Sequence, residues 1–258
     1  TDGISVSESS DEAPDRSCEA WHGENGGNAV RYEEMTIEGR NAVMEAFRSG
    51  KTIDRVYVLK GCQDGPINSI LREARKHDTL VNFVAKERLD QMSKTGKHQG
   101  VIASAAAYEY AEVEDILNLA REKGEPPFIF LLDNIEDPHN LGAIIRTANL
   151  AGAHGVIIPK RHAVGLTATV AKTSAGALNY TPVAKVTNLG ATMEELKKEG
   201  LWFVCADMGG TTMYDLNLTG PIGLVIGNEG EGVGRLVKEK CDYVASIPMK
   251  GDIDSLNA

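Results

Sequence analysis

Phe128-Ile-Phe-Leu-Leu-Asp-Asn-Ile-Glu-Asp-Pro-His-Asn-Leu-Gly-Ala-Ile-Ile-Arg146 is the stretch of the chain that decides its fold. It opens with five consecutive apolar residues, the pattern of a strand buried on both faces of a parallel sheet. A polar segment follows, and apolar residues at helical spacing begin at about Asn140. The stretch therefore predicts a strand–loop–helix unit of an α/β fold, with polar side chains at the carboxyl end of the strand, where such sheets bind ligands.

The same alternation of strand and helix continues to the end of the chain. Further strands are expected at 155–158, 180–184, 201–205, 221–226 and 243–247. Helices are expected at 140–151, 167–175, 189–198 and 233–240. Alternation of this kind predicts a parallel sheet with helices on both of its faces.

The region before this sheet divides into three segments. Residues 1–32 are rich in Ser, Asp, Glu and Gly, which predicts a disordered acidic tail. Residues 33–108 alternate again and predict a small α/β domain, with helices at 37–47, 67–76 and 87–92 and strands at 55–59, 80–84 and 100–107. Residues 109–126 are a charged helical stretch followed by a proline-containing break, and we expect a linker there. The second domain would then comprise residues 127–258.

The composition is that of an ordinary globular protein, with 42% hydrophobic and 25% charged residues among 258. The formal charge of −10 does not favour a nucleic-acid partner, but residues 1–38 carry −8 of it and leave the rest near neutral. No apolar run approaches the roughly 18 residues of a membrane span, and there is no secretory-signal pattern. The four cysteines are scattered, so neither a zinc site nor a disulfide framework is expected. We therefore expect a cytoplasmic protein without a membrane or metal partner.

A glycine-rich loop, Gly227-Asn-Glu-Gly-Glu-Gly232, lies between an expected strand and an expected helix. Its glycines fit neither the G-x-x-x-x-G-K-[ST] of a P-loop nor the G-x-G-x-x-G of a dinucleotide site. A dinucleotide site also needs an acidic residue about 20 positions later, which is missing, so an oxidoreductase is disfavoured. The loop is either a plain tight turn or one whose backbone amides face an uncharged ligand while Glu229 projects toward it.

Two further polar clusters lie at strand ends. Taken alone, Asn140 is a good helix N-cap, and Arg146 is one surface arginine among many. Both lie near the expected ligand edge, however, and Gly142 between them allows close approach of the backbone. In the third cluster, Ile247-Pro-Met-Lys-Gly-Asp-Ile-Asp-Ser-Leu-Asn257, a strand ends into proline and glycine, and Ser255 is placed to cap a helix.

These three clusters, in this order behind an α/β pattern, resemble the SpoU (TrmH-type) branch of the SPOUT superfamily of RNA methyltransferases. The resemblance runs from about residue 33 to residue 258. It implies that residues 127–258 form an α/β trefoil knot with a parallel sheet, which binds S-adenosyl-L-methionine and forms a homodimer. Asp137-Pro-His-Asn-Leu-Gly142 and Gly230-Glu-Gly232 look most like the RlmB-type guanosine-2'-O-methyltransferases of large-subunit (23S) rRNA.

The first domain also carries a resemblance. The segment ending in Lys97-His-Gln-Gly-Val-Ile-Ala103 resembles the ribosomal-protein-like substrate-binding domain that precedes many SpoU domains. This implies that residues 33–108 bind RNA. On the residues alone, Lys94, Lys97 and His98 are explained equally well as a solvated loop.

Carried over residue by residue, the resemblance assigns a site. The catalytic residues would be Arg146, Asn140, Glu229, Ser255 and Asn257, and the cofactor-binding residues would be Gly227, Ile247, Leu256, Met249 and Gly251. No metal is implied. We expect Arg146 to orient the 2'-hydroxyl and a neighbouring phosphate rather than act as a base, because arginine stays protonated in proteins. Glu229 is the candidate proton acceptor.

The expected function is therefore transfer of a methyl group from S-adenosylmethionine to the ribose 2'-hydroxyl of a nucleotide, a guanosine, in large-subunit (23S) rRNA. Two alternatives stay open: a tRNA 2'-O-methyltransferase of the same superfamily, and an RNA-binding protein without catalytic activity. Family members continue past Ser255-Leu-Asn257 into a helix that completes the knot. Because the sequence stops at Ala258, we also expect weak activity and a weak dimer for a chain of this length.

Overall fold

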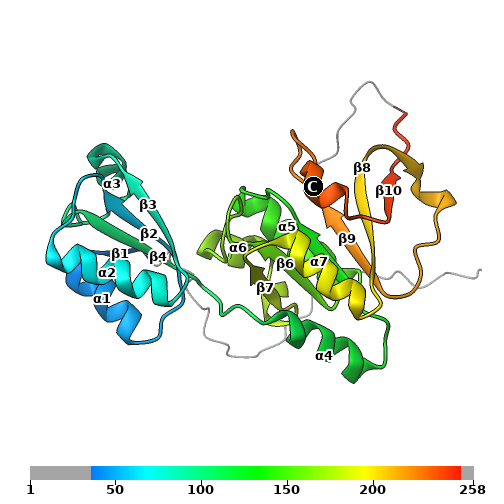
Figure 1. The fold of residues 1–258 in the computed structure, drawn as a ribbon, viewed down its shortest axis with the longest axis horizontal. Helices are drawn as coiled ribbons and strands as arrows, with labels where there is room; N and C mark the ends of the chain where they lie inside the picture. The colour runs from blue at the N-terminus through cyan, green and yellow to red at the C-terminus, as the bar shows by residue number, and fades with distance from the viewer. Residues whose placement is uncertain (1–35, 251–258) are drawn as a thin grey trace, which may run out of the picture. The chain divides into compact units, whose positions relative to one another are not determined.

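The computed structural model describes residues 36–250 of the chain, and the strands within that range form two separate sheets (Figure 1). The first sheet has the strand order β1-β4-β2-β3. Its strands are β1 (Thr36–Glu38), β2 (Ile53–Leu59), β3 (Leu80–Val84) and β4 (Val101–Ala105). Strands β2 and β3 are parallel, whereas β4 is antiparallel to both of its neighbours.

Three helices accompany the first sheet and give it a core of its own. They are α1 (Arg40–Arg48), α2 (Gly65–Lys76) and α3 (Lys86–Met92). The N-cap of helix α2 is Asp64, whose carboxylate accepts a hydrogen bond from the amide of Ile67. The apolar faces of α1 and α2 place Val43, Ile67 and Ile70 in one buried cluster with residues of β2 and β4.

The second sheet contains six parallel strands in the order β10-β8-β9-β5-β6-β7. They are β5 (Phe128–Leu132), β6 (Gly155–Pro159), β7 (Val183–Val186), β8 (Trp202–Thr212), β9 (Ile222–Ile226) and β10 (Tyr243–Ser246). The predicted parallel sheet is thus confirmed. Strand β5 pairs with β9, more than ninety residues later in the chain, in a register that sets Leu132 beside Ile226.

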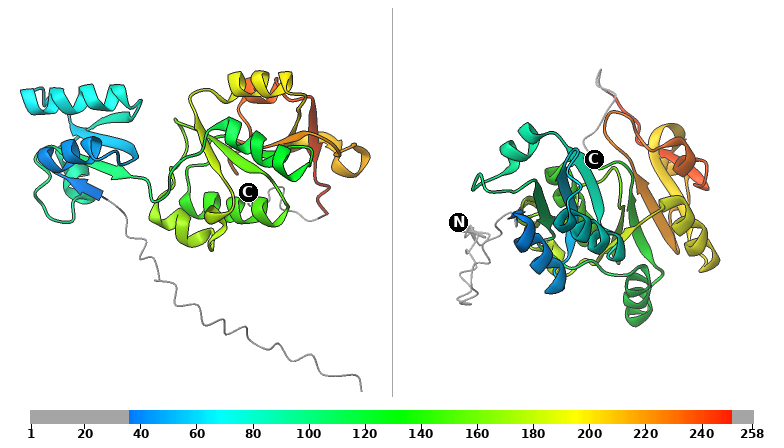
Figure 2. Two further views of the ribbon diagram at one scale, coloured as in Figure 1. Left: turned by 90° about the horizontal axis from the view of Figure 1, so that it is seen from below. Right: turned by 60° about the vertical axis from the view of Figure 1, so that its left-hand side comes forward.

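Helices cover both faces of the second sheet (Figures 1 and 2). They are α4 (Val113–Lys123), α5 (Pro138–Leu150), α6 (Ala168–Thr173), α7 (Leu189–Lys198) and α8 (Arg235–Lys238), with short 3-10 turns η1 (Ala177–Asn179) and η2 (Met213–Asp215). Alternate residues of a strand point to opposite faces. Accordingly Phe130 and Leu132 pack with α5 and α6, whereas Ile129 and Leu131 pack with α4 and α7.

Helix α4 comes from the segment that the sequence predicted to be a linker. Its side chains Ile116 and Leu117 are buried in the core of the second sheet. Ile116 lies so close to β6 that a Cβ atom on Gly155 would approach it within 2.6 Å. The helix ends at Gly124, which adopts the left-handed conformation with φ of 67°. This part of residues 109–126 is therefore packed against the second sheet.

Several element boundaries differ from those expected. The first helix begins at Arg40 rather than Ile37, because Ile37 pairs with Ala103 in β1. Strand β7 begins at Val183, after the turn η1, rather than at residue 180. Helix α8 is shorter than the expected 233–240. Strand β8 continues to Thr212 because β10 pairs with its far end.

Candidate functional site

The candidate site lies at the carboxyl edge of the second sheet, where β5 and β9 end side by side. Just beyond the paired residues, the amide nitrogen of Asp133 donates a hydrogen bond to the carbonyl oxygen of Ile226 (2.8 Å). The buried carboxylate of Asp133 in turn accepts a hydrogen bond from the amide of Gly234 (2.8 Å). These bonds hold together the loops that follow two different strands, so the first and second clusters meet here.

The loop after β9 is a closed turn. Asn228 and Gly232 exchange two backbone hydrogen bonds, of 3.1 and 2.8 Å. The side-chain oxygen of Asn228 accepts hydrogen bonds from the amides of Gly230 and Glu231, and its amide group donates to the carbonyl oxygen of Asn134 (3.2 Å). A Cβ atom on Gly227 would lie 2.2 Å from the carbonyl carbon of Gly232, so the turn requires glycine at 227. Asn228 therefore fixes the turn from inside and leaves Glu229 exposed at its tip.

The first cluster places Asn140 against this turn. The N-cap of α5 is Asp137, whose carboxylate accepts hydrogen bonds from the amides of His139 (2.6 Å) and Asn140 (3.1 Å). The reading of Asn140 as the N-cap is therefore wrong, because Pro138 and Asp137 begin the helix earlier. Freed from capping, the Asn140 side chain donates a hydrogen bond from Nδ2 to Oε1 of Glu229 (2.7 Å). Two of the predicted catalytic residues, 89 positions apart, are thus in direct contact.

Arg146 lies further along α5, on its exposed side. It is six positions after Asn140, which corresponds to about 9 Å along the helix axis. With the residues that the structure describes, its guanidinium makes no hydrogen bond or ion pair. Gly142, between the two, packs against α6 so tightly that a Cβ atom there would lie 1.9 Å from Oγ1 of Thr173. The structure therefore does not bring Arg146 into the contact between Asn140 and Glu229.

The third cluster is described only in part. Ile247 and Met249 follow β10 with 50% and 39% of their surfaces exposed. Gly251, Ser255, Leu256 and Asn257 lie outside the described residues. In the sheet, one strand (β8) separates β9 from β10: Ile226 pairs with Ala206 of β8, whereas Ser246 pairs with Thr212, on the far side of an irregularity in that strand.

These residues fit S-adenosylmethionine in their chemistry. The exposed apolar side chains of Ile247 and Met249 offer a surface for an adenine ring. The turn at residues 227–232 contains no lysine or arginine, so it has no cation for a phosphate. A cofactor with an uncharged nucleoside and no phosphate suits such a site, with Gly227, Ile247 and Met249 as the described residues that would hold it.

Strand β8, between β9 and β10, borders the candidate site on another side. Cys205 of β8 pairs with Val244, but Thr211 pairs with Ala245, the very next residue of β10, so residues 206–210 have no partner in β10 and form a bulge in that ladder. Asp207 in this bulge forms an ion pair with Lys238 of α8 (2.7 Å). The hydrogen bond to Asp207 raises the pKa of Lys238, which therefore stays cationic beside the turn.

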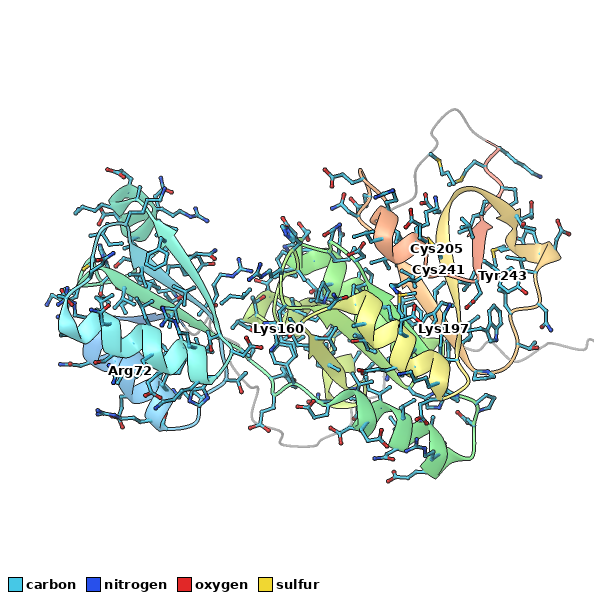
Figure 3. The ribbon with its side chains drawn as sticks, viewed as in Figure 1. Arg72, Lys160, Lys197, Cys205, Cys241 and Tyr243 are labelled. Carbon is cyan, nitrogen blue, oxygen red and sulfur yellow. The ribbon has the colours of Figure 1, made fainter. Side chains whose placement is uncertain are left out.

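Two cysteines lie side by side in the core of the second sheet (Figure 3). A hydrogen bond from Cys241 lowers the pKa of the Cys205 thiol, against the opposing effect of burial. The same hydrogen bond and burial raise the pKa of Cys241. Both cysteines are free thiols. The two cysteines are far apart in the sequence and belong to no common motif, so the sequence did not predict their contact.

Three residues of the site were not singled out from the sequence: Asp133, Asn228 and Asp207. Asp133 directly follows a buried strand, which was an available signal. Asn228 lies inside the glycine-rich motif of residues 227–232, but the hydrogen bonds by which it stabilises the turn depend on the three-dimensional structure. Asp207 lies in a bulge that no periodicity reveals.

Among residues 36–250 there is no group of three or more His, Cys, Asp or Glu side chains arranged to hold a metal ion. No helix in that range combines the length and the apolar character needed to cross a bilayer.

Two family models match the chain. The model described as the SpoU rRNA Methylase family matches residues 127–258. The model described as RNA 2'-O ribose methyltransferase substrate binding matches residues 36–111. The first match covers the second sheet with its candidate site, and the second covers the first sheet.

Curated relatives match over most of their length. A protein of Bacillus subtilis (strain 168), YacO, assigned by its name to the TrmH family of tRNA/rRNA methyltransferases, is 49% identical over 224 residues, 86% of this chain and 89% of the relative. A Staphylococcus haemolyticus protein with the same family name is 45% identical over 227 residues, 88% of this chain and 91% of the relative.

Solved structures show the same fold. The SpoU methyltransferase AviRb from Streptomyces viridochromogenes, crystallised with its cofactor AdoMet, is 26% identical with a TM-score of 0.53, covering 90% of this chain and 88% of that one. An AdoMet-bound rRNA methyltransferase from Sinorhizobium meliloti is 22% identical with a TM-score of 0.51, covering 86% of this chain and 81% of that one.

Proposed function

The chain belongs to the SpoU methylase family of RNA methyltransferases, and on that basis we propose that it transfers a methyl group from S-adenosyl-L-methionine to a ribose 2'-hydroxyl of RNA. The observation that carries the proposal is the hydrogen bond between Asn140 and Glu229. It joins the first and second polar clusters at the ligand-binding edge of a parallel sheet. A carboxylate held by an amide group at such an edge suits the positioning and deprotonation of a hydroxyl group.

We assign separate roles to the residues of the site. Glu229 accepts the proton of the ribose hydroxyl, and Asn140 holds the Glu229 carboxylate in place through its 2.7 Å hydrogen bond. Arg146, exposed and without a partner among the described residues, binds the phosphate next to the target ribose and so orients the hydroxyl. S-adenosylmethionine, when bound, supplies the electrophilic methyl group. Gly227, Ile247 and Met249 would hold it, together with Gly251 and Leu256 from the segment outside the described residues. Ser255 and Asn257, in the same segment, would complete the catalytic site.

The substrate that we propose is a guanosine of large-subunit rRNA. It is supported by the likeness of residues 137–142 and 230–232 to the RlmB-type pattern, while the names of the relatives cover both tRNA and rRNA. We further propose a trefoil knot in residues 127–258, a homodimer formed through that domain, and a substrate-binding domain in the region of residues 33–108. A cytoplasmic location stays a prediction that the free thiols favour.

The test is methyl incorporation by the purified chain. It is incubated with radiolabelled S-adenosylmethionine and, separately, with total rRNA and total tRNA from a strain that lacks the gene, and the 2'-O-methyl positions are mapped. We expect incorporation into large-subunit rRNA at one guanosine. Incorporation into tRNA alone would select the alternative substrate. RNA binding without calorimetric binding of S-adenosylmethionine would overturn the proposed methyltransferase activity and indicate a non-catalytic RNA-binding protein.

A further inference from the structure

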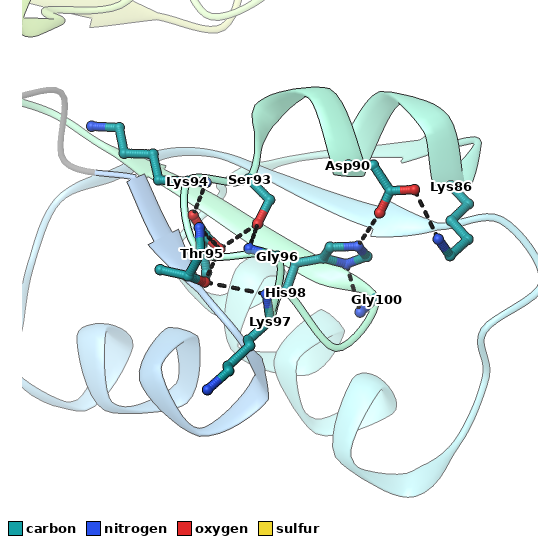
Figure 4. Close-up of polar contacts among 10 residues, drawn as sticks. Lys86, Asp90, Ser93, Lys94, Thr95, Gly96, Lys97, His98 and Gly100 are labelled. Atoms are coloured by element: carbon teal, nitrogen blue, oxygen red, sulfur yellow. Dashed lines mark hydrogen bonds and ion pairs between the residues drawn. The ribbon is translucent and has the colours of Figure 1, made fainter.

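A rigid turn on the first sheet connects α3 to β4. Residues Ser93 to Lys97 form this turn (Figure 4). Its first residues fold over the carboxylate of Glu38, at the end of β1. Glu38 accepts hydrogen bonds from the hydroxyl groups of Ser93 and Thr95 (both 2.6 Å) and from the amides of Lys94 (2.6 Å) and Thr95 (3.4 Å). One carboxylate therefore pins three consecutive residues of the turn.

The far end of the turn is fixed as well. The buried ring of His98 accepts a hydrogen bond at Nδ1 from the amide of Gly100 (3.0 Å), so Nε2 carries the hydrogen that faces Asp90 (2.9 Å). Gln99 accepts two hydrogen bonds from Arg40, one from its amide and one from its guanidinium. The turn is thus held from both ends by α1, α3 and β1.

The backbone amides of residues 94–97 already donate hydrogen bonds within the first domain. The amides of Lys94 and Thr95 bond to Glu38, that of Gly96 to the Ser93 hydroxyl (2.8 Å), and that of Lys97 to the Thr95 hydroxyl (3.2 Å). Consecutive free amides are what bind a small anion in a backbone nest. A nest is therefore not available here, and an anionic ligand has to be held by side chains.

The side chains that the turn presents are cationic. Lys94 and Lys97 are both exposed and extend outward from the turn (Figure 4). Nearby carboxylates are engaged elsewhere: Asp90 pairs with Lys86 (2.8 Å) and Asp64 with Arg40 (2.6 Å). No ion pair among the described residues involves Lys97. The turn therefore carries positive charge on a rigid support.

We propose that this turn binds the phosphate backbone of the RNA substrate, with Lys97 as its principal contact and Lys94 beside it; the proposal rests on the RNA methyltransferase function proposed above. Lys94 and Lys97 are three positions apart, so their Cα atoms are separated by at most about 10 Å, and their long side chains can reach different phosphates of one strand. Lysine binds phosphate as a point charge without reading the base. The contact therefore supplies affinity and orientation, whereas the choice of nucleotide rests with other residues.

The test is a charge reversal with a matched control. Lys97→Glu is compared with Lys51→Glu, because Lys51 is also an exposed lysine but precedes β2, at the end of the first sheet opposite to the turn. Affinity for total rRNA and for a labelled uridine oligonucleotide is measured by fluorescence or filter binding over a range of salt concentrations. We expect Lys97→Glu to weaken binding by about five- to tenfold and to reduce the salt slope by about 1, with Lys97→Ala intermediate. Lys51→Glu should match the wild type.

The outcomes separate this proposal from the proposed function. Lys97→Glu should leave calorimetric binding of S-adenosylmethionine unchanged. If the wild-type chain binds RNA but not the cofactor, the proposed methyltransferase function is wrong, whereas the proposal for the turn still stands. Equal RNA affinity and salt slope in Lys97→Glu and wild type would overturn the turn proposal. So would an equal loss in Lys51→Glu, which would indicate overall charge alone. Binding of polyglutamate as tight as that of RNA would reassign the surface to an acidic protein partner.

Discussion

The proposed role of Arg146 in binding the RNA can be tested by a single substitution. It is exposed on α5, about 9 Å along the axis from the pair of Asn140 and Glu229, and we assign it to the RNA rather than to the cofactor. Arg146→Ala should lower methyl transfer by at least about 100-fold while leaving the calorimetric affinity for S-adenosylmethionine nearly unchanged. Arg146→Lys should also be poor, because one ammonium group cannot reproduce the planar fork. Wild-type turnover in the alanine variant would contradict this role.

Glu38 makes the turn of residues 93–97 sensitive to acid. Burial raises its pKa, but the hydrogen bonds from Ser93, Thr95 and Lys94 outweigh that effect and lower the pKa from 4.5 to about 2. Because the pKa is depressed in the folded state, the charged form stabilises the turn fully above pH about 4.5, and this stabilisation is lost as the pH falls toward about 2.

This sign predicts a change in amide hydrogen exchange. After correction for the intrinsic rate, protection of the Lys94 and Thr95 amides should fall as the pH is lowered through that window. Glu38→Gln has no charge to lose there, so protection in that variant should be low already and nearly independent of pH. Parallel pH profiles in the two proteins would show that the Glu38 carboxylate does not hold the turn.

At the scale of elements, the contact between α5 and α6 depends on the absence of a side chain. A Cβ atom on Gly142 would lie 1.9 Å from Oγ1 of Thr173, so Gly142→Ala should force the helices apart and destabilise the protein by about 1–3 kcal/mol. The matched control is Gly65→Ala at the start of α2, where a Cβ atom would meet nothing within 4 Å. That control should be neutral or slightly stabilising. Denaturant unfolding compares them, and equal midpoints would refute the packing argument.

The elements were predicted best where one local pattern decides them. Strands β3 and β5 have the expected bounds, because apolar runs between polar segments leave one interpretation. Strand β8 was predicted too short, because its far half is a strand through pairing with β10 beyond the bulge. Helix α1 was predicted too long, because the pairing of Ile37 with β4 overrides its helical spacing.

The candidate site shows the same limit. The sequence indicated that Asn140 and Glu229 belong to one edge, because both follow strands of a parallel sheet. It did not predict their hydrogen bond, because that depends on Asp137 taking the N-cap position and leaving the Asn140 side chain free. The contact between Cys205 and Cys241 likewise follows from the packing of β8 against the turn after α8, which no local motif records.

At the scale of the whole molecule, each sheet has a core of its own, and a matched pair of substitutions tests their independence. Ile70 is fully buried in the first core and Ile145 in the second. Each Ile→Ala change should cost about 2–5 kcal/mol. Ile70→Ala should speed amide exchange in β1 to β4 alone and leave S-adenosylmethionine binding intact. Ile145→Ala should speed exchange in β5 to β9 and weaken cofactor binding. Equal effects of both variants on both sheets would indicate one cooperative unit.

The pairing of β5 with β9 also has a consequence for biosynthesis. During translation β5 emerges first, and its partner on one side, β9, follows more than ninety residues later. At roughly 5–20 residues per second, that edge of an entirely apolar strand waits for several seconds beside the ribosome. Strands β5, β6 and β7 can pair in the meantime, but the edge that carries the candidate site cannot assemble before β9 arrives. The side of β5 that will pair with β9 therefore stays exposed on the nascent chain unless another molecule covers it. Slowing translation between residues 160 and 220 should increase aggregation rather than aid folding.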